Sequence, residues 1–369
     1  MMLSTPHRPA SIRFLLPALC LCLFVPPLPA QEAKTAITPR ILAGDGTRGY
    51  RDGPGSTAQF QSPYGIVAAA DGNLYVSDTL NHRIRRIDRD GKVSTFAGDG
   101  TAGFRDGPAR RARFDAPSGL GIAPDGSLLV ADTRNNRIRR ITMDGKVSTV
   151  AGAGTIGLED GAAAEALFDG PTGVAAAADG TIYVADTLNR SIRAIGTDGK
   201  LSTLAGERTP TPEFRDGASA EARFDTPIGI VYDAKEDVLY VADTHNHRIR
   251  RVSRKGVVST VAGSTRGDSD GEDARFNTPY GIALGAGGTL YVTDSGNRSI
   301  RRIVPGEPVS RVSTVAGKNP ARDAAGRAIR PDLPIGIATR DGSLYVVDSV
   351  GHQIIVFDGV EAPAAEPGR

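Results

Sequence analysis

Residues 74–87 read LYVSDTLNHRIRRI, and near-copies of this stretch return at five later places in the chain. The copies are LLVADTRNNRIRRI (128–141), IYVADTLNRSIRAI (182–195), LYVADTHNHRIRRV (239–252), LYVTDSGNRSIRRI (290–303) and LYVVDSVGHQIIVF (344–357). The central aspartates are therefore 54, 54, 57, 51 and 54 residues apart. Such a regular period indicates one structural unit written six times, with neighbouring units stacked on each other.

Each unit has the pattern of four short strands joined by turns. In the first unit we expect strands at 63–67, 73–77, 83–87 and 93–97, separated by Asp-Gly turns and by the turn 78–81. Leu74 and Val76 alternate with their neighbours in the period of a strand. Four antiparallel strands per unit form the blade of a β-propeller, so we predict an all-β, six-bladed propeller.

The two ends of the repeat region are complementary. Residues 41–44, ILAG, match the last strand of the complete units, for example STFAG at 94–98, but no repeat precedes them. The sixth unit ends at Gly359 without such a strand. We therefore predict one propeller domain, 41–359, closed by an N-terminal strand that completes the last blade.

The flanking segments differ in composition from the repeats. Arg8 and Arg13 precede an apolar run and a small-residue cleavage site before Gln31, which is the pattern of a signal peptide at 1–30. Cys20 and Cys22 lie in that run, where the preceding leucines disfavour a lipoprotein signal. A leader (31–40) and a disordered Pro/Ala tail (360–369) complete the chain. We expect a secreted or periplasmic protein with no membrane span after cleavage.

The charge balance bears on the class of partner. The chain has 44 basic and 42 acidic residues, and removal of residues 1–30 takes two basic residues away, which leaves 42 of each. A neutral protein is a poor binder of nucleic acid. Because both cysteines would leave with the signal peptide, the mature chain would have neither a disulfide nor a cysteine metal site.

The repeat unit resembles the NHL repeat, most literally in Asn81-His82-Arg83-Ile84 and Asn246-His247-Arg248-Ile249. The resemblance extends over almost the whole chain from residue 41 to 357. It implies a six-bladed propeller closed by an exchanged strand. Some members resemble protein or RNA binding platforms, and related six-bladed propellers include lyases and lactonases, so the fold leaves the function open.

A residue that is present in every blade is expected to be architectural, because a single active site breaks the symmetry of a ring. We assign a structural role to the turn aspartates, which can accept hydrogen bonds from the amides of their own turn and face a neighbouring arginine. A metal-binding ring of carboxylates is the alternative. The six are Asp78, Asp132, Asp186, Asp243, Asp294 and Asp348. For Arg83, Arg85, Arg86 and their copies we expect solvated or paired positions on an outer strand.

Long loops join the last strand of one unit to the first strand of the next, for example 99–113 and 153–167. Most contain Asp-Gly followed by Ala-x-Phe, as in Asp106-Gly107 and Ala112-Arg113-Phe114, and we predict an Asp-capped helical turn whose Phe enters the core. These loops and the Asp-x-x-Asn turns should share one face, the expected binding face.

Several catalytic motifs match only superficially. GxGxxG occurs at 44–49, 98–103 and 152–157 without a following helix, which argues against a dinucleotide site. Ser269 lies in a GxSxG match, but it is a loop position rather than a nucleophile elbow.

The candidate ligand-binding residues are those that break the sixfold pattern. Two tyrosines follow the first proline of an innermost strand, beside the tunnel mouth. Three histidines lie in turns, where we expect solvent exposure, with a metal or catalytic role as the alternative. Two aromatic-arginine pairs lie in long loops, and such residues are frequent in binding hot spots. They are Tyr64 and Tyr280; His82, His245 and His247; and Phe104-Arg105 and Phe214-Arg215.

These features favour an exported binding scaffold that holds a protein or carbohydrate ligand through its loop-rich face, as a monomer without a cofactor. The alternative is a metal-dependent lyase or gluconolactonase-like hydrolase with a divalent metal at the tunnel mouth. The Pro-x-Gly starts of the innermost strands offer hydroxyl and apolar groups but no ligand cluster, which argues against an enzyme.

Overall fold

The computed structural model describes residues 1–2, 37–207, 213–306, 309–317 and 319–360. The expected signal peptide from residue 3 onward, most of the expected leader and the tail from 361 lie outside these ranges. Within the described ranges, no helix has the length and apolar character that a membrane crossing requires.

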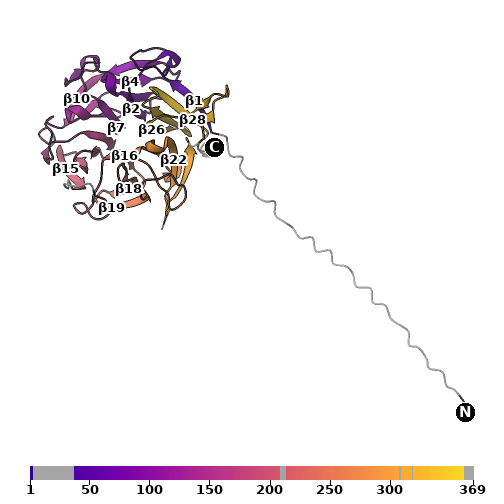
Figure 1. Ribbon diagram of the computed structural model, residues 1–369. Helices are drawn as coiled ribbons and strands as arrows, with labels where there is room; N and C mark the ends of the chain where they lie inside the picture. Colours follow the sequence, from indigo (N-terminus) through magenta and orange to yellow (C-terminus); the bar gives the residue numbers. More distant parts are fainter. Residues whose placement is uncertain (3–36, 208–212, 307–308, 318, 361–369) are drawn as a thin grey trace. The chain divides into compact units, whose positions relative to one another are not determined.

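Six antiparallel sheets form the six blades of a ring, so the predicted β-propeller is confirmed (Figure 1). The strands of blades 1 to 3 are β2 (Pro63–Ala68), β3 (Leu74–Asp78), β4 (Arg83–Ile87) and β5 (Val93–Ala97); β7 (Pro117–Ile122), β8 (Leu128–Asp132), β9 (Arg137–Ile141) and β10 (Lys146–Ala151); and β12 (Pro171–Ala176), β13 (Ile182–Asp186), β14 (Ser191–Ile195) and β15 (Lys200–Ala205). Those of blades 4 to 6 are β16 (Pro227–Asp233), β17 (Val238–Asp243), β18 (Arg248–Ser253) and β19 (Val258–Gly263); β20 (Pro279–Leu284), β21 (Leu290–Asp294), β22 (Ser299–Val304) and β23 (Arg311–Ala316); and β26 (Pro334–Arg340), β27 (Ser343–Asp348) and β28 (Gln353–Asp358).

Short elements fill the connections between these strands. Blades 2 and 3 each gain a two-residue outer strand, β6 (Gly107–Pro108) and β11 (Gly161–Ala162). A small hairpin, β24 (Ala321–Arg322) and β25 (Ala328–Ile329), precedes blade 6. The 3₁₀ turns are η1 (Gly55–Thr57), η2 (Thr79–Asn81), η3 (Ala109–Arg111), η4 (Thr133–Asn135), η5 (Ala286–Gly288) and η6 (Ser295–Asn297).

The predicted closure of the ring is confirmed. Strand β1 (Thr38–Ala43) pairs antiparallel with β28, with Thr38 opposite Asp358 and Ile41 opposite Ile355. The strand begins at Thr38 rather than at Ile41, the predicted start of the propeller domain. Blade 6 therefore takes its outer strand from the opposite end of the repeat region.

Apolar side chains fill the space between neighbouring blades. Phe60 of the first long loop, for example, packs with Val76 of blade 1 and Val347 of blade 6. Phe114, Phe168, Phe224 and Phe276 are equally buried at the equivalent positions, which confirms that the Ala-x-Phe phenylalanines enter the core. The Asp cap expected for the adjacent helical turn is wrong, because η1 and η3 have no side-chain cap.

The glycine of each Pro-x-Gly start allows the innermost strands to meet around the axis. A Cβ on Gly65 would lie 2.4 Å from the Ser118 carbonyl oxygen of the next blade, and one on Gly336 would lie 2.2 Å from that of Tyr64. The four other blades have the same contact, at Gly119, Gly173, Gly229 and Gly281. A side chain larger than hydrogen therefore has no room at these positions.

Candidate binding face

The long loops and the Asp-x-x-Asn turns lie on the same face of the ring, as the strand order predicts. In blade 1 the backbone N–H of Gln61, at the end of a long loop, donates to Asp78 Oδ1 at 2.7 Å, and the N–H of Leu80 donates to the Gln61 carbonyl at 3.1 Å. We call this side of the propeller the loop-rich face. The Asp-Gly turns between the first and second strands lie at the opposite end of the blades.

A buried ion-pair network lies beneath this face in five blades. In blade 1, Arg85 Nη1 donates to Asp78 Oδ2 at 2.6 Å and Nη2 donates to Asp52 Oδ1 at 2.7 Å. The carbonyls of Arg51 and Gln59 accept further hydrogen bonds from this guanidinium. The equivalent arginines are Arg139, Arg193, Arg250 and Arg301, each between a turn aspartate and a loop aspartate.

These arginines correct one expectation. Arg85 and its four equivalents are paired, as predicted, but they are fully buried. They lie on the third strand of each blade, between two neighbours, so the prediction of solvated positions on an outer strand is wrong. A charge at such depth is tolerated only when its donors are paired, and the two aspartates and two carbonyls satisfy this condition in blade 1.

The turn aspartates hold the loop-rich face onto the strands. In blades 1 to 5 their backbone hydrogen bond comes from the segment just before the innermost strand, for example from Gln61 in blade 1 and Asp115 in blade 2. The predicted bond from an amide of their own turn is found in blade 6, where the N–H of Gly351 donates to Asp348. Burial raises the pKa of Asp132, and also those of Asp186 and Asp243, to about 6 against the pull of the arginine.

The sequence predicted that the loop aspartates cap a helical turn, and it did not predict that they pair with the buried arginines. Asp52 also accepts a hydrogen bond from the N–H of Thr95, so it joins the long loop to the outer strand of its own blade. The signal was present: five units have both the buried arginine and an Asp-Gly in the preceding long loop, and the sixth unit lacks both. The equivalents of Asp52 are Asp106, Asp160, Asp216 and Asp270.

The loop aromatics cover this network. The ring centroid of Phe104 lies 4.0 Å from Cζ of Arg137 and 4.7 Å from Cζ of Arg139, and Phe214 and Tyr50 make the same contacts in blades 4 and 1. Each of these rings is still exposed by 41 to 44%. The neighbouring Arg105 is exposed and bonded to Asp99 at 2.9 Å. The carbonyls of Arg105 and Arg215 both accept a hydrogen bond from the buried arginine of their blade.

The candidate histidines have two different roles. The N–H of Ala116 donates to Nδ1 of His82 at 3.1 Å, and the N–H of Thr278 donates to Nδ1 of His247 at the same distance, so each ring links its turn to the next blade. Burial lowers the pKa of both rings, which favours this neutral, accepting state. His245, which is more than half exposed, contacts Thr226 instead, so the turn does not bring His245 and His247 onto a common partner.

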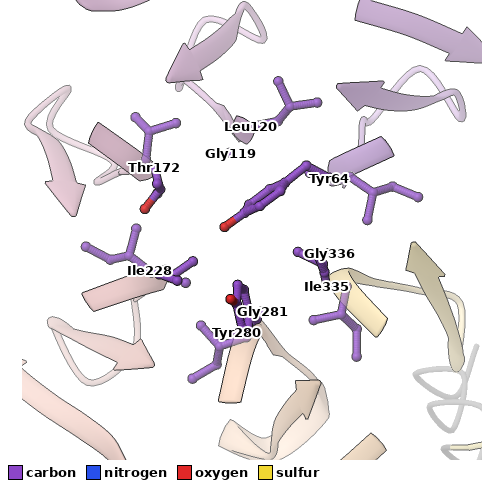
Figure 2. Close-up of a pocket in the computed structure, with 17 residues that line it drawn as sticks. Tyr64, Gly119, Leu120, Thr172, Ile228, Tyr280, Gly281, Ile335 and Gly336 are labelled. Carbon is purple, nitrogen blue, oxygen red and sulfur yellow. The ribbon is translucent and has the colours of Figure 1, made fainter. Parts of the chain in front are cut away.

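The two candidate tyrosines meet in the central tunnel. The rings of Tyr64 and Tyr280 lie 6.5 Å apart in an edge-to-face arrangement, and burial raises the pKa of both hydroxyls. Figure 2 shows Tyr64 and Thr172 pointing into the centre of a cavity of about 70 Å³, with Ile228 and Ile335 on its wall.

The lining of this cavity consists of glycine, aliphatic, threonine and tyrosine residues. It supplies no carboxylate or imidazole, the groups that usually bind a divalent metal. The cavity lining therefore does not fit a metal centre. Among the described residues, no cluster of three or more His, Cys, Asp or Glu side chains could hold a metal ion.

Exposed apolar side chains gather on the loop-rich face. Of the large apolar residues that are exposed in the described ranges, eight lie in its loops and turns: Tyr50, Leu80, Phe104, Ile156, Leu158, Leu188, Phe214 and Val350. Large contiguous apolar patches mark binding surfaces, so this face is the candidate one.

Comparison with known proteins identifies the repeat. The NHL repeat family model matches residues 114–141 and 224–252. NHL repeat-containing protein 2 of Bos taurus is 32% identical over 292 residues, which cover 69% of this chain and 40% of the relative. The chain thus spans about 40% of the length of that relative.

Solved structures share the fold at low identity. A virginiamycin B lyase from Staphylococcus aureus, crystallised with quinupristin, has a TM-score of 0.53 at 19% identity, covering 80% of each chain. A gluconolactonase from Xanthomonas campestris has a TM-score of 0.56 at 15% identity, covering 88% of this chain and 90% of its own. The repeat match, the relative and the six-bladed ring agree, and the chain belongs to the NHL repeat family.

Proposed function

We propose that the chain is a binding scaffold that holds a protein or carbohydrate ligand on its loop-rich face. The observation that carries this proposal is the gathering of exposed apolar side chains there, above a network that fixes the loops. Since the Asp-Arg-Asp network joins the long loops of five blades both to a turn and to the outer strand, most of the face is held in a defined geometry before a ligand arrives. Preorganised loops bind at a lower entropic cost.

Direct screening tests this proposal. The mature protein is screened against a glycan array and a peptide display library, and each ligand found is measured again with Phe104→Ala/Phe214→Ala. We expect affinity to fall at least about tenfold, since exposed aromatic residues are frequent hot spots. The matched control is Met143→Ala/Val257→Ala, which removes exposed apolar side chains from the turns of the opposite face.

Two results would oppose the scaffold. One is an equal loss of affinity in the control variant, and the other is the absence of any ligand from either screen. Melting curves of both variants are recorded first, because Phe104 also covers Arg139.

The second candidate function is an enzyme at the tunnel mouth, of lyase or lactonase type. It is favoured by the hydroxyls of Tyr64, Tyr280 and Thr172 around the central cavity, and solved neighbours include a virginiamycin B lyase and a gluconolactonase. Turnover of a streptogramin or a sugar lactone that is lost in Tyr64→Phe/Tyr280→Phe would support the enzyme. Elemental analysis of the purified protein would show whether a divalent metal accompanies it.

We also propose that the protein is exported after cleavage at about residue 30, because of the charged and apolar pattern of the first residues. N-terminal sequencing of the protein recovered from the culture medium or the periplasm would find Gln31 first. A cytoplasmic protein that begins at Met1 would contradict export.

A further inference from the structure

Among the residues that the structure describes, blade 3 carries the most exposed group of aliphatic side chains on the loop-rich face. Ile156 is 64% exposed, Leu188 is 57% exposed and Leu158 is 37% exposed. Ile156 and Leu158 lie in the long loop, and Leu188 lies in the turn. A hydrogen bond joins the two segments: Asn189 Nδ2 of the turn donates to the Gly157 carbonyl of the loop at 2.7 Å. The loop and the turn therefore form one continuous surface, which we call the blade 3 patch.

The segments that form this patch carry a different charge from the equivalent segments of blade 2, although Arg137 and Arg190 border them. No lysine, arginine or histidine occurs in residues 147–189, whereas six acidic residues do. The loop 153–170 contains four of them: Glu159, Asp160, Glu165 and Asp169. Glu159 and Glu165 are exposed, while Asp160 is bonded to the buried Arg193.

Blade 2 provides an internal reference, since its residues are 54 positions earlier in the same fold. Five arginines in the loop and turn of blade 2 are replaced in blade 3, while one arginine, Arg190, appears where blade 2 has Asn136. The replacements are Arg105 by Glu159, Arg110 by Ala164, Arg111 by Glu165, Arg113 by Leu167 and Arg134 by Leu188. The backbone is the same, as shown by the equivalent bond from Asn135 Nδ2 to the Gly103 carbonyl at 2.8 Å. The strands thus keep their architecture while the loop surface changes from basic to acidic and aliphatic.

From this replacement we infer that the blade 3 patch docks a segment of a partner protein in which lysine or arginine residues flank aliphatic side chains. The inference rests on the proposed scaffold function and names the class of its ligand. Ile156, Leu158 and Leu188 supply apolar contact area, and Glu159 and Glu165 provide complementary charge at its edge. A sugar ring would require aromatic faces for stacking, which the patch does not offer, and a polyanion would be repelled by its carboxylates.

The test uses a display library of random dodecapeptides on the mature protein. We expect the selected peptides to be enriched in Lys or Arg together with Leu, Ile or Val. One synthetic peptide is then measured by fluorescence anisotropy. Ile156→Ser/Leu188→Ser should weaken binding at least about tenfold. Glu159→Arg/Glu165→Arg, which restores the residues of blade 2, should weaken binding and reduce its salt dependence.

The matched control is Ala102→Ser/Arg134→Ser, the same positions in blade 2, and it should change the affinity by less than about twofold. All altered positions in blade 3 are exposed, so the variants should melt like the parent. Melting curves check this before any affinity is compared.

The remaining outcomes overturn the inference in distinguishable ways. Peptides without basic residues, or peptides whose binding depends on Phe104 and Phe214 but not on Ile156 and Leu188, would refute the patch and leave the scaffold standing. The same follows if only glycans bind. If Ile156→Ser/Leu188→Ser converts a dimer into a monomer in sedimentation, the patch is an interface between two copies. If no peptide and no glycan binds, the scaffold itself fails.

Discussion

Blades 1 and 6 bury the same turn aspartate but satisfy it in different ways. Asp78 of blade 1 accepts one backbone N–H and the side chains of Asn81 and Arg85. Asp348 of blade 6 accepts three backbone N–H groups, those of Asp332, Leu333 and Gly351. The strand position of Arg85 is occupied by Ile355, which is also fully buried.

The comparison separates two functions that coincide in the other blades. The aspartate holds the segment before the innermost strand through its backbone N–H groups, and this function persists in blade 6 without an arginine. The arginine belongs with the loop aspartate and the long loop, because the sixth unit lacks the arginine together with the Asp-Gly of the loop. Blade 6 has the hairpin β24–β25 in this region and takes β1 as its outer strand.

The largest effect is expected from removing the strand that is special to blade 6. Deletion of residues 37–44 removes β1 and exposes the edge of β28. About five backbone hydrogen bonds at about 1 kcal/mol each would be lost, a large share of the 5–15 kcal/mol that is typical of a domain. The variant should aggregate and lose its cooperative melting transition in calorimetry.

A deletion of residues 31–36 is the control, since it leaves β1 intact. A 37–44 deletion variant that melts as cooperatively as the parent would contradict closure by β1.

The next effect concerns the arginine that blade 6 lacks. Arg139→Met should destabilise the protein by about 3–5 kcal/mol, because Asp132 then remains buried without its cation. The folded-state pKa of Asp132, already raised to about 6 by burial, should rise further. The folded variant then takes up a proton that the unfolded chain lacks, so its stability should increase as the pH falls from 7 to 5.

Urea unfolding at both pH values measures this change. The control is Arg140→Met in the same strand, whose side chain is partly exposed and paired with Asp125 at 2.7 Å, and which should cost about 0–1 kcal/mol. Equal losses in the two variants would show that the buried network contributes no more than a surface ion pair.

The smallest effect concerns a hydrogen bond to the next blade, which blades 1 and 6 both make through a histidine. His82 and His352 both accept an N–H from the next blade, and blade 2 uses Asn136 for the same bond, to Gly170 at 2.9 Å. His82→Asn should therefore change stability by less than about 1 kcal/mol at pH 7. His82→Ala should cost about 1 kcal/mol, because the N–H of Ala116 loses its acceptor.

The pH dependence distinguishes the histidine from the asparagine. Burial lowers the pKa of His82 below 6.5, so the unfolded chain binds a proton that the folded chain resists, and this contribution to stability is lost as the pH falls below 6.5. The Asn variant should lack this part of the decline in thermal melts between pH 7 and 5. An unchanged pH profile would assign the decline to other groups.

The sequence was sufficient for the architecture because the architecture is periodic. Six copies of the aspartate turn predicted six blades, and the unpaired segment at 41–44 predicted closure, which β1 and β28 confirm. The site was less predictable. A residue such as Arg85 reads as a surface charge until its two aspartates, 7 and 33 positions away, are placed beside it.

The histidines were difficult for a related reason. Their type varies from blade to blade, which suggested chemistry, but the structure uses His82, Asn136 and His247 for one backbone contact. These side chains share only a hydrogen-bond acceptor at the same place in the blade. A comparison of residue types does not reveal this shared position.

The ring of glycines around the tunnel also limits how this chain can evolve. Since each glycine touches the carbonyl of the next blade and Gly336 returns to Tyr64, the six contacts form a closed cycle with no spare distance. Gain or loss of a whole repeat would change every one of these contacts at once. The glycine contacts therefore constrain the number of repeats. The loops far from the axis take no part in these contacts and can diverge one blade at a time.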